Sequence, residues 1–161
     1  MNITRLGGPI MYSKILVPLD GSDNAYRALD HAIDLAKVFH SELYLLHIID
    51  TGRANSYSGG MAAGLVYKEL LENDEQRGQA ILDKAVAIAE KEDVPVTRLQ
   101  VKGATKPLIA KDIPEKYAID LIAMGKSGTD ALSRILLGST TAYVVRNADT
   151  NVTVVSMPDE A

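Results

Sequence analysis

The chain has 161 residues, of which 47% are hydrophobic, and its formal net charge is −4. This length suits one ordinary domain with a real core, and the acidic balance provides no basic surface for nucleic acid. The absence of cysteine excludes disulfides, thiolate catalysis and cysteine-based metal sites. No apolar stretch approaches the ~20 residues of a membrane span, and the first residues lack the apolar core of a secretory signal. We therefore expect a cytoplasmic protein.

Residues 1–12 contain Gly7-Gly8-Pro9 and show no hydrophobic period, which predicts a flexible N-terminal extension. Residues 13–158 show no internal repeat and no linker, so we expect them to form a single domain. Short apolar runs predict strands within this domain, and the third of the five alternates loosely between apolar and polar residues. In chain order they are Lys14–Leu19, Leu43–Ile49, Val94–Val101, Ile119–Met124 and Val152–Val155.

Apolar residues at helical spacing predict a helix after each of the first four strands. The expected ranges are Ala25–Ala36, about Leu65–Glu92, Thr105–Tyr117 and Ser139–Asn147, with a further helical turn near Leu132–Leu136. Ser22 or Asp23 would cap the first helix. The stretch from Asp50 to about Gly64 is rich in Gly, Ser and Asn, which predicts a mobile loop.

Two residues should disturb the predicted helices. Gly78 would weaken the second helix by about 1 kcal/mol relative to Ala if it is exposed. Pro114 lacks the amide hydrogen of the helical ladder, so it should kink the third helix or end a segment there.

Strands alternate with helices along the whole chain, and the strands are continuous apolar runs. This pattern is typical of a parallel sheet that is covered on both faces. Right-handed crossovers then predict an α/β fold, a three-layer α/β/α sandwich around a five-stranded, doubly wound sheet. Ligands of such sheets bind beyond the carboxyl ends of the strands, where the strand order reverses. Asp20 and Gly125 each follow a strand, so we expect them to meet at one crevice.

The most informative motif is Gly125-x-x-Gly128, followed after nine residues by Gly138-Ser139-Thr140-Thr141. Glycine after a strand lets the backbone approach a ligand closely, and a helix start with hydroxyl residues offers donors to a polyphosphate. The motif therefore suggests ATP. Taken alone, the glycines could also form a tight turn and the second group a simple helix cap.

Other phosphate motifs do not match. Gly125-Lys126-Ser127 is similar to the end of a Walker A loop, but position 120, where that loop requires glycine, is Asp120. The turn after the first strand also lacks the dinucleotide fingerprint. The ammonium of Lys126 could contact a phosphate or point to water. His31, His40 and His47 do not cluster at metal-ligand spacing, and each is better interpreted as a surface or a satisfied buried histidine.

Nearly the whole stretch from Lys14 to Met157 resembles the universal stress protein family, and the glycine spacing matches its ATP-binding branch. The resemblance rests on Val17-Pro18-Leu19-Asp20-Gly21-Ser22, His47-Ile48-Ile49-Asp50, Gly103 and the glycine motif. It implies a fold of the adenine-nucleotide alpha-hydrolase-like type, which agrees with the sandwich predicted above.

The resemblance also implies a role for each site residue. Pro18, Leu19 and Ile48 would line the base, and Asp20 would face the adenosine end of the nucleotide. Met124 and Gly125 would bring backbone against the ribose and the first phosphate. The phosphate chain would be held by Gly128, Gly138, Ser139, Thr140 and Thr141. Mg²⁺ would be bound mainly by the phosphates and water.

Family members commonly dimerise through the last strand, and Asn151–Val155 would be an apolar edge that needs cover. The leading hypothesis is an ATP-binding, homodimeric regulatory protein of the stress response with an unknown protein partner. It would act as a nucleotide-dependent conformational switch or interaction module. The alternatives are a nucleotide-free dimeric interaction module of the same fold and a slow ATPase. No catalytic residue is assigned, because no general base or arginine finger accompanies the glycine turns.

Overall fold

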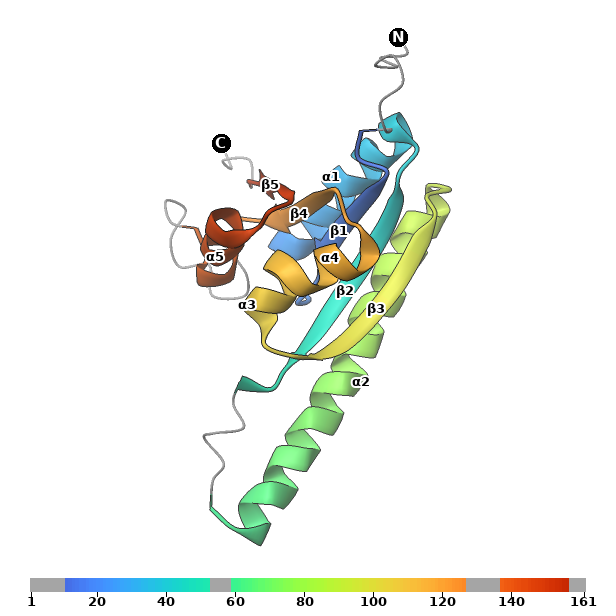
Figure 1. Ribbon diagram of the computed structural model, residues 1–161. Helices are drawn as coiled ribbons and strands as arrows, with labels where there is room; N and C mark the ends of the chain where they lie inside the picture. The colour runs from blue at the N-terminus through green and yellow to red at the C-terminus, as the bar shows by residue number, and fades with distance from the viewer. Residues whose placement is uncertain (1–10, 53–58, 127–136, 157–161) are drawn as a thin grey trace, which may run out of the picture.

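A computed structural model of the chain describes residues 11–52, 59–126 and 137–156. Helices cover both faces of a central sheet (Figure 1). The strands are β1 (Lys14–Pro18), β2 (Glu42–Asp50), β3 (Val96–Gly103), β4 (Leu121–Gly125) and β5 (Asn151–Val155). The helices are α1 (Asp23–Phe39), α2 (Met61–Lys91), α3 (Thr105–Pro107), α4 (Ile113–Tyr117) and α5 (Ser139–Asn147), with a π-helical turn, η2 (Leu108–Asp112), between α3 and α4.

All neighbouring strands of the sheet are parallel, and their order is β3-β2-β1-β4-β5. The chain winds outward from β1 through β2 to β3, then returns to the other side of β1 to form β4 and β5. Ile15 of β1 accordingly lies between Leu43 of β2 and Leu121 of β4. The predicted α/β sandwich is confirmed, and its strand order reverses between β1 and β4.

Each face of the sheet has its own apolar core, which explains why the central strand β1 has a continuous apolar run. Leu16 and Val17 are adjacent in β1 and fully buried, yet they belong to different clusters. Val17 packs with residues of α1 and α2, whereas Leu16 packs with residues of η2, α4 and α5. A strand whose two faces are both covered has no polar side to alternate with.

Helix α2 has two halves with different surroundings. Its buried residues are all in the second half, namely Gly78, Ile81, Leu82, Ala85 and Ala89. The first half extends beyond the sheet (Figure 1), and Met61 and Leu65 are 87% and 65% exposed there. The expected loop to Gly64 is therefore too long, because Met61–Gly64 are helical; residues 53–58 lie outside the described ranges. The predicted destabilisation by Gly78 applied only to an exposed glycine, and Gly78 is buried.

The helical run after β3 is divided into segments, as Pro114 predicts. Helix α4 directly follows η2, and Pro114 is its second residue and is buried. The amide of Ile113 donates to the carbonyl of Leu108, five residues back, which is the π-helical spacing. Because proline has no amide hydrogen, the ladder cannot continue unbroken through this position. The predicted helical turn near Leu132–Leu136 lies outside the described residues.

None of the helices within the described ranges is both long and apolar enough to cross a membrane.

Candidate functional site

A cavity of about 410 Å³ lies at the carboxyl ends of β1, β2 and β4, where the strand order reverses. Every predicted site residue within the described ranges lines it. These residues are Pro18, Leu19, Asp20, Ile48, Met124, Gly125, Gly138, Ser139, Thr140 and Thr141. Gly128 lies outside the described residues. Sequence segments separated by about a hundred residues thus meet at one crevice, as the topology requires.

The turn after β1 is fixed by side-chain hydrogen bonds. The Asp20 carboxylate accepts from the amide of Ser22 at 2.9 Å and from its hydroxyl at 2.5 Å. Ser22 in turn caps α1, because its Oγ accepts from the amide of Ala25 at 3.2 Å. Gly21 has φ +85°, a conformation that suits glycine. This turn holds the Asp20 carboxylate at the cavity.

The turn after β4 contributes backbone groups and short hydroxyl side chains. Gly138 precedes α5 as its N-cap and offers no side chain to the first amides of the helix. The hydroxyl of Thr141, which is buried, donates to the carbonyl of Gly125 at 2.9 Å and so ties α5 to β4. We call the cavity-lining residues Gly125, Gly138, Ser139, Thr140 and Thr141 the α5 wall. Free helix-start amides beside hydroxyl groups are suited to an anion.

Two backbone hydrogen bonds connect the α5 wall to the end of β5. The amide of Gly138 donates to the carbonyl of Lys126 at 2.9 Å, and the amide of Lys126 donates to the carbonyl of Val155 at 3.0 Å. Lys126 therefore has a structural part at the backbone level. Its side chain is absent from the cavity lining, so the structure does not bring its ammonium to the site.

Apolar side chains form another part of the lining. Pro18 ends β1 and Leu19 directly follows it, while Ile48 comes from β2, Ile109 from η2 and Met124 from β4. Leu19 is 3% exposed and Met124 is 7% exposed, so both are part of the core as well as of the lining. Such a surface is suited to a flat apolar ring.

Two residues on the side of α2 line the cavity but were not predicted. His47 of β2 is 3% exposed, and its Nδ1 has no hydrogen-bond partner within the described part of the chain. Burial, followed by the positive charge of Arg77, lowers the pKa of His47 and keeps the ring neutral. Arg77 of α2 also lines the cavity, and its side chain is 67% exposed. We call His47 and Arg77 the α2 wall.

The interpretation of His47 as a satisfied buried histidine is wrong for Nδ1, whereas His31 and His40 are exposed. Gly78, which packs against His47, was the sequence signal for this environment, because a glycine within a long helix often marks close packing. The other lining residues that sequence reasoning missed are Ser22, Ala25, Leu46, Thr105 and Ile109. No group of three or more possible metal-ligating side chains lies together within the described ranges.

The fold and the cavity define a class of parallel α/β proteins whose switch point combines an apolar surface with a glycine- and hydroxyl-rich helix start. The model of the universal stress protein family matches residues 11–156. Universal stress protein MJ0531 of Methanocaldococcus jannaschii is 36% identical over 158 residues, which are 98% of this chain and 90% of the relative. The chain belongs to the universal stress protein family.

Solved structures agree with this assignment. Universal stress protein UspA from Lactobacillus plantarum superposes with a TM-score of 0.80 at 29% identity, over 91% of this chain and 99% of its own. A universal stress protein solved in complex with cAMP has a TM-score of 0.64 at 25% identity, over 91% and 98% of the two chains. The fold is therefore the adenine-nucleotide alpha-hydrolase-like fold of this family.

Proposed function

We propose that this protein binds an adenine nucleotide, ATP in the first place, and that binding regulates its interactions in a stress response. The observation that carries the proposal is the shared location of ten predicted site residues in one cavity. Its volume of about 410 Å³ falls within the range of small-molecule sites. The relative solved with cAMP supports an adenine nucleotide as the class of ligand.

The apolar lining would take the base, and Asp20 would meet the adenosine end. Pro18 and Leu19 at the end of β1 and just beyond it, together with Ile48 of the neighbouring β2, offer an apolar surface to a ring. The Asp20 carboxylate is an acceptor, so it suits the amine or hydroxyl donors of adenosine.

The α5 wall would hold the phosphates. Gly138 leaves the first amides of α5 without a side-chain cap, and Ser139 and Thr140 add hydroxyl donors at the cavity. Anions bind well at such helix starts because the amides and the helix dipole both favour negative charge. Mg²⁺, which prefers oxygen ligands and keeps several waters, would bind mainly through the phosphates.

Isothermal titration calorimetry with ATP and Mg²⁺ tests the proposal. We expect saturable binding in the micromolar to millimolar range, and an absence of heat over this range would overturn it. Gly138→Asp should abolish binding, because it places a side chain and a negative charge at the α5 wall. Gly64→Asp is the matched control, since a side chain at Gly64 meets no atom within 4 Å. Mass spectrometry of nucleotide released from the purified protein would identify the ligand.

We also propose that the protein forms a homodimer through β5. This strand is the last in the sheet order, and Val152–Val155 remain partly exposed. An exposed, apolar edge strand tends to be covered by another chain. Light scattering after size-exclusion chromatography should give twice the monomer mass, and Val154→Lys should reduce it to one. A monomeric native protein would contradict the proposal.

A further inference from the structure

Arg77 is the only lysine or arginine that lines the cavity in the described part of the chain. It approaches from α2, which packs on the sheet face opposite to that of α5. The α5 wall offers neutral donors, so Arg77 is the positively charged group of the lining. The sequence motif gives no role to this residue.

The backbone of α2 lies directly against the sheet at this point. A Cβ atom on Gly78 would lie 2.2 Å from Nδ1 of His47 and 2.4 Å from Nε2 of Gln100, which leaves no room for a side chain. Gly78 thus lets α2 approach β2 and β3 closely. Arg77 directly precedes Gly78, so this contact fixes the backbone that carries it beside the cavity.

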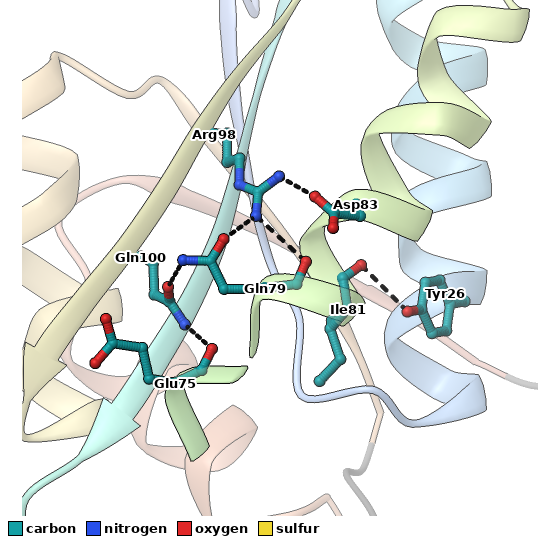
Figure 2. Close-up of polar contacts among 7 residues, drawn as sticks. All are labelled: Tyr26, Glu75, Gln79, Ile81, Asp83, Arg98 and Gln100. Carbon is teal, nitrogen blue, oxygen red and sulfur yellow. Dashed lines mark hydrogen bonds and ion pairs between the residues drawn. The ribbon is translucent and has the colours of Figure 1, made fainter. Parts of the chain in front are cut away.

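A network of hydrogen bonds between α2 and β3 holds the same segment (Figure 2). Gln100 donates to the carbonyl of Glu75 at 3.0 Å and accepts from the side chain of Gln79 at 2.9 Å. Arg98 donates to the side chain of Gln79 at 2.6 Å and pairs with Asp83. Glu75 and Gln79 flank Arg77, so the backbone that carries the guanidinium is bonded to β3 on both sides.

The guanidinium itself is held only weakly. Its Nη2 lies 3.8 Å from Oδ1 of Asp74, three residues earlier on α2, and 67% of the side chain is exposed. An exposed intrahelical pair of this kind contributes little, so exchanging Asp74 for a ligand anion has a small cost. Arginine is well suited to phosphate because its planar group donates two parallel hydrogen bonds.

We propose that Arg77 binds a phosphate of the nucleotide and determines how strongly the site prefers ligands with more phosphates. This inference rests on the proposed nucleotide-binding function. ATP should gain more from Arg77 than AMP does, and adenosine should gain nothing. Arg77 would thus complete the α5 wall from the opposite face of the sheet.

Calorimetric titration of the native protein, Arg77→Gln and Arg77→Lys with ATP, AMP and adenosine tests the proposal. Arg77→Gln should weaken ATP binding about tenfold and leave adenosine binding unchanged. Arg77→Lys keeps the positive charge, so it should weaken ATP binding less than Arg77→Gln does. Lys68→Gln is the matched control, because Lys68 is also exposed on α2 and lies 3.8 Å from Glu72. Its ATP affinity should equal that of the native protein.

Each result has a defined meaning. If the native protein does not bind ATP, the proposed function fails before Arg77 is tested. If the native protein binds ATP and Arg77→Gln binds it equally well, the inference about Arg77 is wrong. An equal loss for ATP and adenosine would also overturn it, because a loss independent of charge indicates a structural effect.

Discussion

The α5 wall and the α2 wall of the cavity are built in different ways. The α5 wall consists of glycines and hydroxyl residues from one stretch of the chain, and it offers small neutral donors. The α2 wall consists of His47 of β2 and Arg77 of α2, which line the same cavity because α2 packs closely against β2 at Gly78. A local motif can thus supply the donors of a site, while helix packing supplies its charge.

We expect the largest effect from Gly125→Ala, which tests whether the α5 wall needs close backbone contact. A Cβ on Gly125 would lie 2.7 Å from the backbone oxygen of Asn24 in α1, so Gly125→Ala must push β4 and α1 apart. We expect it to lower the free energy of unfolding by about 3 kcal/mol, measured by urea denaturation. Gly59→Ala, whose Cβ would make only an ordinary contact, is the control. Equal stability of both variants would mean that Gly125 is a simple turn residue and is not required for close packing against α1.

We expect a smaller effect from Gly78→Ala, which tests the packing of the α2 wall. Gly78→Ala gains helix propensity but forces the new methyl group against His47 and Gln100, so we expect a net loss of about 2 kcal/mol. Gly64→Ala lies in the same helix with open space around it and should instead stabilise the protein by about 0.5–1 kcal/mol. The pair can be compared by thermal or urea unfolding. A gain in stability for both variants would show that α2 does not need its close approach to β2.

The smallest effect is a pH dependence that originates in the α2 wall. Burial, and then Arg77, lowers the pKa of His47 below its ordinary value of 6.5, while Asp74 and Asp20 act in the opposite direction. Below pH 6.5 the unfolded chain therefore binds more protons than the folded one. The resulting stability is present above pH 6.5 and is lost as the pH falls, by at most about 0.8 kcal/mol at pH 6.

Unfolding free energies of the native protein and His47→Gln, compared between pH 7.5 and pH 6, would measure this contribution. The variant should show a smaller loss on acidification than the native protein. Identical profiles for the two proteins would mean that His47 titrates normally in the folded state.

Much of the fold could be predicted because its signals are local. The predicted ranges of all five strands overlap the observed ones, and β1, β2 and β4 are mostly buried apolar runs. The helix Ser139–Asn147 was predicted with its observed bounds, because a glycine and hydroxyl residues mark its start. The start of α2 was missed, because the Gly-, Ser- and Asn-rich stretch was extended to Gly64, although Met61–Gly64 are helical.

In the candidate site, too, residues with a local signal could be predicted and the others could not. Pro18 to Asp20 and the α5 wall follow strand ends, so their meeting place could be derived from topology alone. His47 belongs to β2 and Arg77 to α2, and only the three-dimensional packing brings them to one cavity. Gly78 carried the relevant signal, but without a known neighbour it could be interpreted only as a weak point in a helix.

The two backbone hydrogen bonds of Lys126 have a consequence for regulation. They join the N-cap of α5 to the last residue of β5 through a single intervening residue. A ligand that fixes Gly138 therefore also restrains the carboxyl end of the edge strand. If a second chain pairs along β5, linkage requires that nucleotide changes the affinity between chains by the same factor by which pairing changes the affinity for nucleotide.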